Sequence, residues 1–80
     1  MIIKMKYLGL ITGNLPTSIE VSDGTDLAGL IQAMRDEYGV ERIDTIVKKS
    51  TFLVNNKKTD ENSQLNDGDK VMVLTVLGGG

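Results

Sequence analysis

Apolar and polar residues alternate at the start of the chain. Ile3, Met5 and Tyr7 are separated by lysines, and a period of two is typical of a strand with one buried face. The pattern predicts a first strand over about residues 2–10. This strand would present a lysine face to solvent and an apolar face to a core.

A turn and a second strand are expected next. Residues 12–16 include Gly, Asn and Pro, which accept turn geometry or cannot donate to a strand ladder. Ile19 and Val21 then alternate with polar residues, which predicts a strand over about residues 17–21. The two strands are expected to pair as an antiparallel hairpin.

The most regular pattern follows this hairpin and indicates a helix. Its apolar residues recur at spacings of three and four and form one stripe: Leu27, Leu30, Ile31, Met34 and Tyr38. We predict Thr25 as the N-cap, Asp26 in the first turn and Gly39 at the end. Gly29 lies inside the helix at a cost of about 1 kcal/mol relative to Ala. We interpret it as tolerated there, in preference to close packing against the sheet.

The pattern is less regular after Gly39. Residues 40–50 are compatible with a short helix or with an irregular apolar loop. Residues 51–54 have strong β propensity and predict a third strand. Asn55-Asn56 predicts a two-residue turn, because Asn tolerates positive φ, and residues 57–59 then form a short return strand.

The final part of the chain predicts one more strand and completes the fold. Residues 60–66 are polar except for Leu65, and Asp67-Gly68-Asp69 predicts a turn into a strand over residues 70–77. This order of elements fits an α+β protein of the β-grasp (ubiquitin-like) class, with a mixed four- to five-stranded sheet and one main helix on one face. The first and last strands would be adjacent and parallel. We expect a single domain over residues 1–77, followed by a flexible glycine tail, 78–80.

Composition limits the chemistry open to this chain. With 80 residues and 40% apolar content, it can form one core. It has neither Cys nor His, so it lacks a thiolate or imidazole for nucleophilic catalysis and the usual ligands of structural zinc. Its net charge is −2, which gives no reason to expect nucleic acid. No stretch resembles a secretory signal or a membrane span, so we expect a cytoplasmic protein without membrane association.

The carboxylate pairs do not indicate an active site. Asp36-Glu37 and Asp60-Glu61 lie in contexts typical of a solvated helix or loop. Asp67 and Asp69 lack the further spaced ligands of a calcium loop, so no metal site is expected. An independent enzyme is therefore disfavoured.

The C-terminal residues Gly78-Gly79-Gly80 suggest another role. Glycine leaves the thinnest thread of backbone, which can enter a channel too narrow for side chains. A frayed terminus is the alternative explanation of the run. The glycines alone do not choose between the two.

Three segments together resemble a known family. Leu65-Asn66-Asp67-Gly68-Asp69-Lys70-Val71 resembles the acidic turn into the last strand of the ubiquitin-like sulfur carriers, and Phe52-Leu53-Val54-Asn55 is similar to their apolar segment before a hairpin turn. These carriers, of the ThiS/MoaD type, include the thiamine-biosynthesis sulfur carrier and the small subunit of molybdopterin synthase. The family usually ends in two glycines. Gly79 and Gly80 match that pair, and Gly78 replaces a more variable residue.

The resemblance implies a carrier and not an enzyme, although the chain could count as the small subunit of a synthase. An E1-like partner enzyme would use ATP and magnesium to adenylate the Gly80 carboxylate, and a sulfur donor would convert it to a thiocarboxylate. Gly79 would let the Gly80 carboxylate extend into the active site of the partner enzyme. The sulfur would pass to an acceptor synthase for molybdopterin, thiamine or related biosynthesis. The chain itself would bind no cofactor, and would be a monomer alone or a hetero-oligomer with its partner.

Two other functions remain open at this point. A protein modifier, conjugated through Gly80 to lysines of target proteins, needs the same tail and the same activation. A plain β-grasp binding module would carry its glycines incidentally.

Alternation in the last strand predicts a surface for such partners. Val71, Val73 and Thr75 would face the helix, which leaves Met72, Leu74 and Val76 on the opposite face. Leu53 would point outward beside them if Phe52 and Val54 point inward. We predict that Leu53, Met72 and Leu74 form an exposed apolar docking patch, with Val76, Leu77 and Gly78 continuing the contact toward the tail. The alternative is that residues 40–50 fold over this patch.

Overall fold

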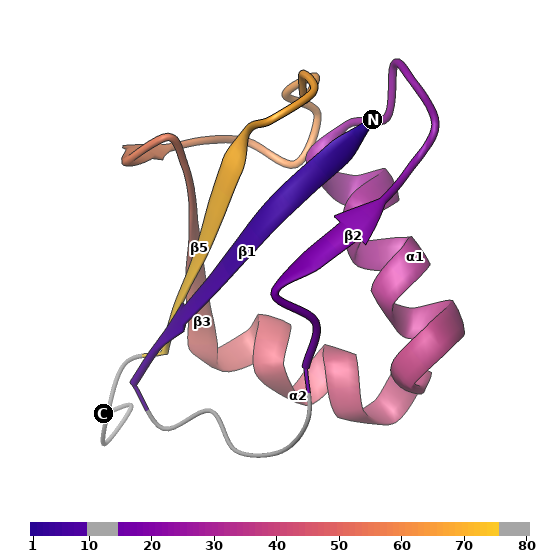
Figure 1. Cartoon of the computed structure of the whole chain (residues 1–80). Helices are drawn as coiled ribbons and strands as arrows, with labels where there is room; N and C mark the ends of the chain where they lie inside the picture. Colours follow the sequence, from indigo (N-terminus) through magenta and orange to yellow (C-terminus); the bar gives the residue numbers. More distant parts are fainter. Residues whose placement is uncertain (10–14, 76–80) are drawn as a thin grey trace.

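The computed structural model describes residues 1–9 and 15–75 (Figure 1). Its five strands form one mixed sheet in the order β2-β1-β5-β3-β4. The two central strands, β1 and β5, are parallel, and every other neighbouring pair is antiparallel. The elements are β1 (Ile2–Leu8), β2 (Ser18–Glu20), α1 (Leu27–Tyr38), α2 (Val40–Lys49), β3 (Ser50–Val54), β4 (Lys57–Lys58) and β5 (Lys70–Thr75). The predicted β-grasp arrangement is confirmed, including the parallel pairing of the first and last strands.

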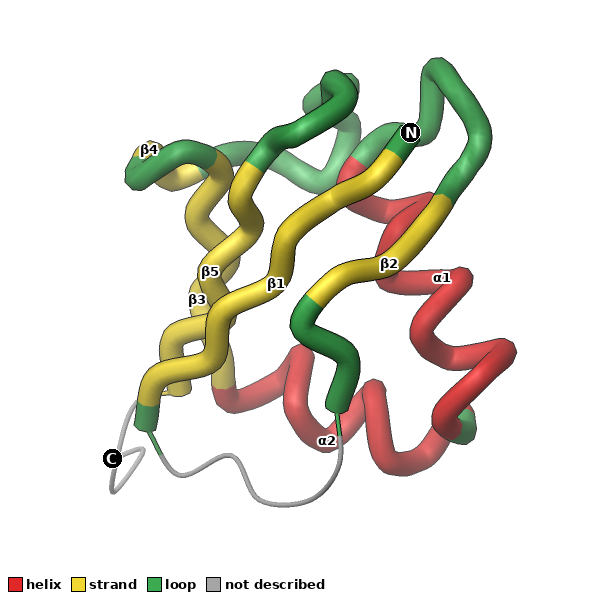
Figure 2. The backbone as a smooth tube through the Cα atoms, in the orientation of Figure 1, coloured by secondary structure: helices red, strands yellow, loops and turns green. Residues whose placement is uncertain are grey.

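Both helices lie on the same side of the sheet (Figure 2). Residues 40–50, which the sequence left between helix and loop, form α2 and the first residue of β3. Ile43 anchors α2 with 1% of its surface exposed. The sequence predicted one main helix. The structure has two, and both contribute side chains to the core. The inner face of the sheet and both helices share one apolar cluster, whose buried members are Ile3, Met5, Ile19, Leu27, Leu30, Ile31, Met34, Ile43, Leu65, Val71 and Val73.

The start of α1 differs from the prediction by one residue. Asp26, and not Thr25, is the N-cap, because its Oδ1 accepts a hydrogen bond from the backbone N–H of Gly29 at 2.8 Å. The Thr25 hydroxyl instead donates to the carbonyl oxygen of Ser22 at 2.6 Å. Thr25 and Asp26 are both favourable N-cap residues, and the position of the backbone in the first helical turn decides between them.

Gly29 has a packing role that the interpretation of simple tolerance missed. A Cβ on this residue would lie 2.8 Å from Thr25 Cγ2 and 3.2 Å from Asp26 Oδ1. The close neighbours are therefore the residues of the cap, and not the sheet. A glycine here lets the capping carboxylate approach the helix end.

Several strand boundaries are shorter than predicted. β1 ends at Leu8, because Gly9 turns away with φ of 102°, and residues 10–14 lie outside the described part of the chain. β2 covers residues 18–20 in place of the predicted 17–21. β5 is described as far as Thr75. The predicted extension of this strand through Val76 and Leu77 lies outside the described residues.

The turn at Asn55-Asn56 is confirmed. Both residues have positive φ, 51° and 69°, as a tight hairpin turn between β3 and β4 requires. Leu65, the apolar residue of the polar segment after β4, is buried with 1% exposure. Its N–H donates to the carbonyl oxygen of Thr25, which ties this segment to the start of α1.

Candidate functional site

The last strand occupies the centre of the sheet, between β1 and β3, and leads directly to the C-terminal segment (Figure 1). Thr75 is its last described residue. The predicted site residues beyond it lie outside the described part of the chain: Val76, Leu77, Gly78, Gly79 and Gly80. The structure therefore describes the base of the proposed tail, and the roles of the tail residues stay predictions.

Thr75 is held from both neighbouring strands. On the β1 side, a Cβ at Gly9 would overlap the carbonyl oxygen of Thr75 and lie 3.1 Å from its Cβ. On the β3 side, the hydroxyls of Ser50 and Thr75 form a hydrogen bond of 2.9 Å. We call Gly9, Ser50 and Thr75 the tail anchor. Its glycine needs both its positive φ and its missing side chain, so the point from which the C-terminal segment departs is fixed.

Sequence reasoning missed this anchor. Gly9 was included in the first strand because the alternation of Ile3, Met5 and Tyr7 runs up to it. A glycine at the end of an alternating run is the one local signal that was available. The partner that gives Gly9 its role lies at the other end of the sequence.

The open face of the sheet carries the three residues of the predicted patch, of which Leu74 is exposed, whereas Leu53 and Met72 are half-buried. Leu53 and Met72 are direct partners in the β3–β5 register, and Leu74 is the partner of Leu8 in the β1–β5 register. Leu74 is 36% exposed and Leu8 is 41% exposed. These four residues form what we call the apolar patch. Leu8 is an addition to the three predicted residues.

The predicted orientations on the inner face are borne out by the packing. Val71 and Val73 are fully buried, and Phe52 and Val54 pack against the core. The alternative in which residues 40–50 fold over the apolar patch is not observed, because α2 packs on the inner side with Ile43 in the core. The apolar patch therefore lies on the side of the sheet that neither helix covers.

Lysines border the apolar patch. Lys4 and Lys6 alternate with buried residues of β1 and are exposed on the open face. Lys70 is the register partner of Lys4, and Lys6 is the register partner of Met72. We call Lys4, Lys6 and Lys70 the lysine group. It was not singled out from the sequence, because the shared face depends on the pairing of the first and last strands.

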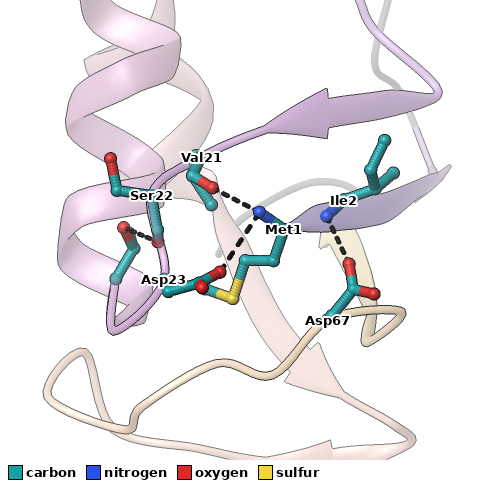
Figure 3. Close-up of polar contacts among 7 residues, drawn as sticks. Met1, Ile2, Val21, Ser22, Asp23 and Asp67 are labelled. Atoms are coloured by element: carbon teal, nitrogen blue, oxygen red, sulfur yellow. Dashed lines mark hydrogen bonds and ion pairs between the residues drawn. The ribbon is translucent and has the colours of Figure 1, made fainter.

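The opposite end of the same strands is held by polar contacts. Asp67 Oδ1 accepts from the backbone N–H of Ile2 at 2.7 Å, and the Met1 amino group donates to Val21 O at 2.7 Å (Figure 3). The carboxylate of Asp69 accepts from Asn66 N and Asn55 Nδ2. The acidic turn is therefore engaged in joining strands. These contacts give the two aspartates a structural role.

Tyr7 links the inner face to the segment before β2. Its hydroxyl donates to the carbonyl oxygen of Pro16 at 2.7 Å. Burial raises the pKa of Tyr7 to about 12, and the neighbouring Tyr38 adds to this increase. The neutral phenol is thus the form that the folded protein stabilises.

Other features of the described residues are less suggestive of a site. A cavity of about 290 Å³ lies on the helix side, with Leu27, Ile31, Val47 and Phe52 among its lining residues. Among the residues that the structure describes, no three His, Cys, Asp or Glu side chains are grouped to hold a metal ion. No helix in the described ranges has both the length and the apolarity to cross a membrane.

Comparison with known proteins agrees with this geometry. The strand order and the placement of the helices define a β-grasp fold. The chain belongs to the ThiS family, whose family model matches residues 9–80. The resemblance found in the sequence is therefore confirmed. No curated protein matches the chain.

Two solved structures share the fold. A chain of the complex of subunits 1 and 2 of molybdopterin-converting factor from Helicobacter pylori is similar with a TM-score of 0.69 and 21% identity, and all of both chains is covered. A putative molybdopterin converting factor subunit 1 from Pyrococcus furiosus has a TM-score of 0.68 and 18% identity, over 95% of this chain and 98% of that one. Similarity at this level of identity shows a common fold.

Proposed function

We propose that this protein is a sulfur carrier whose Gly80 carboxylate is activated by an ATP-dependent adenylating enzyme and converted to a thiocarboxylate. The observation that carries the proposal is the ThiS family match, which extends from Gly9 through Gly80. The tail anchor supports it, because a fixed departure point limits the positions that a short glycine segment can reach.

The chemistry has three steps. A Gly80 carboxylate oxygen attacks the α-phosphorus of ATP and displaces pyrophosphate, which gives an acyl adenylate. The persulfide sulfur of a donor then attacks the acyl carbon and displaces AMP. The resulting acyl disulfide is cleaved by a second thiol, which forms a disulfide with the donor sulfur and leaves the thiocarboxylate on Gly80. The chain contributes no Cys or His to these steps, so the donor and the partner enzyme supply the reacting thiols and the proton transfers.

The partners of this reaction dock on the open face in our proposal. Leu53, Met72 and Leu74 provide the apolar contact, and Val76, Leu77 and Gly78 continue it toward the active site of the adenylating enzyme. A sulfur-acceptor synthase uses the same face after loading. The relatives that are subunits of a two-subunit molybdopterin-converting factor favour a molybdopterin-type acceptor.

Mass spectrometry of the intact protein from its own cells tests the proposal. A carrier gains the mass difference between sulfur and oxygen at Gly80, whereas a protein modifier is found in larger conjugates. A matched preparation lacking Gly79 and Gly80 is the control and gains neither. A chain that functions normally without these glycines would contradict the proposal and favour a plain binding module.

The docking part has a separate test. Leu74→Asp places a charge on the apolar patch and is expected to raise the KM for adenylation at least tenfold while the circular dichroism spectrum stays unchanged. Asn56→Asp, in the exposed turn after β3, adds the same charge away from the patch and serves as the control. Equal KM values for Leu74→Asp and wild type would exclude the patch as the docking surface.

A further inference from the structure

The lysine group lies on a part of the sheet where edge protection does not account for it. Lysines on edge strands commonly prevent sheets from pairing with one another. Lys4 lies between Ser18 of β2 and Lys70 of β5, and Lys70 is on β5, which has β1 and β3 as neighbours. Lys6 lies on β1 beyond the described pairing with β2. Another reason is needed for three positive charges on the centre of this face.

Among the described residues, these charges have no carboxylate in ion-pair contact. Lys4 and Lys70 are direct register partners, and like charges directly opposite one another destabilise a sheet. No ion pair joins any member of the lysine group to a carboxylate within residues 1–9 and 15–75. The nearby carboxylates of Asp67 and Asp69 accept hydrogen bonds from Ile2, Asn55 and Asn66. The register also places Lys58 opposite Leu53 and one carboxylate, Glu20, opposite Ile2 on this face. The described open face therefore carries more positive than negative side chains, although the chain has a net charge of −2.

The charge and the apolar patch form one continuous surface. Lys6, Met72 and Leu53 occupy successive positions of one row across β1, β5 and β3. The adjacent row places Leu8 beside Leu74, at the end of the sheet from which the tail departs. Lys4 and Lys70 form the next row, and exposed Ile2 lies opposite Glu20 beyond them. The lysine group thus lies farther from the tail anchor than Leu8 and Leu74 do.

Resting on the proposed function, we propose that the open face selects an adenylating enzyme whose docking surface has an apolar centre and a carboxylate-bearing rim opposite the lysine group. The apolar patch supplies contact area, and the lysine group sets orientation and association rate. The orientation matters because it directs the tail end of the sheet toward the active site.

Two other occupants fit this surface less well. A second copy of the chain, docked face to face, would bring two lysine groups together. A single-stranded nucleic acid would need aromatic side chains for base stacking. The chain has one Phe, two Tyr and no Trp, and Tyr7, Tyr38 and Phe52 all pack against the core. A protein with acidic residues at its rim satisfies both the charge and the apolar area.

Steady-state adenylation kinetics with the adenylating enzyme from the same cells test this assignment. The double variant Lys4→Gln/Lys6→Gln is expected to raise the KM for the carrier about 5- to 20-fold and to change kcat less than about twofold. The difference from wild type should shrink as ionic strength rises, because salt screens exposed charges. Lys4→Arg/Lys6→Arg should restore the KM.

A matched double variant controls for net charge. Lys48→Gln/Lys57→Gln removes the same two charges from the exposed side of α2 and from β4, where Lys57 is paired with inward-facing Val54. Its KM should remain within about twofold of wild type. Equal effects of the two double variants would overturn the proposal, as would a salt-independent KM. Failure of the wild-type chain to be adenylated at all would instead overturn the proposed function.

The same wild-type and variant proteins also test the two alternative occupants of the open face, a second copy of the chain and a single-stranded nucleic acid. Sedimentation should give a monomer for the wild-type chain, and fluorescence anisotropy should detect no binding of single-stranded RNA. A dimer disrupted by Leu74→Asp, or RNA binding lost in Lys4→Gln/Lys6→Gln, would contradict an acidic protein partner.

Discussion

The two faces of the sheet are built from alternate residues of the same strands, yet they are organised differently. Val71 and Val73 are completely buried in the core that the sheet shares with the helices, whereas Met72 and Leu74, their immediate neighbours, lie on the open face. The inner face is apolar except at the end of the sheet, where Ser50 and Thr75 share a hydrogen bond, and the open face combines the apolar patch with the lysine group. The difference teaches that stability resides mainly in the inner face, and our proposal assigns recognition to the open face, so substitutions should separate the two properties.

The largest expected effect comes from placing the same charge on either side of β5. Val73→Asp buries an uncompensated carboxylate and should destabilise the protein by more than about 4 kcal/mol, which matches or exceeds what a core of this size supplies. Leu74→Asp should cost less than about 1 kcal/mol because its side chain is 36% exposed. Urea unfolding measures both. A folded Val73→Asp variant would break the distinction between the faces.

A smaller loss of stability is expected at the tail anchor, which lies at the end of the sheet. Gly9→Ala combines an unfavourable positive φ with overlap against Thr75, and should cost about 1–3 kcal/mol. Gly68→Ala is the matched control, since Gly68 also has positive φ, at 85°, but nothing lies within 4 Å of its Cβ position. Thermal unfolding and adenylation kinetics together are the measurement. We expect Gly9→Ala to lower kcat more than Gly68→Ala, and equal losses would remove any special role of the anchor.

The smallest effect concerns Tyr7 at alkaline pH. The pKa of Tyr7 is raised from 10.0 to about 12, so the folded state keeps its proton more tightly than the unfolded state. Its contribution to stability is fully present below about pH 10 and is lost as the pH rises toward 12. Tyr7→Phe also removes the hydrogen bond to Pro16 and should cost about 1 kcal/mol at neutral pH.

Ultraviolet titration and unfolding at several pH values check this prediction. The variant should lose the high-pH tyrosinate transition and show a weaker decrease in stability between pH 10 and pH 12. If Tyr7→Phe loses as much stability as wild type over this pH range, groups other than Tyr7 cause the loss. Activity at neutral pH should be retained, because Tyr7 lies on the inner side and not on the docking face.

Much of the fold was predictable because its signals are local. Alternation in β1 and β5, the apolar stripe of α1 and the paired asparagines each reflect a short repeat or turn. One error occurred where neighbouring residues compete for one role. Thr25 and Asp26 are both good caps, and only the three-dimensional path of the first turn selects Asp26.

The sequence by itself determined the order of elements, the inward and outward positions of each strand and the glycine-rich end, because these depend on residues close together in the chain. Only the tertiary structure decided which distant residues meet. Pairing of β1 with β5 brings Gly9 against Thr75 and Lys4 beside Lys70, and the direction of α2 leaves the apolar patch uncovered. Such contacts depend on strand register and helix packing, which no local period encodes.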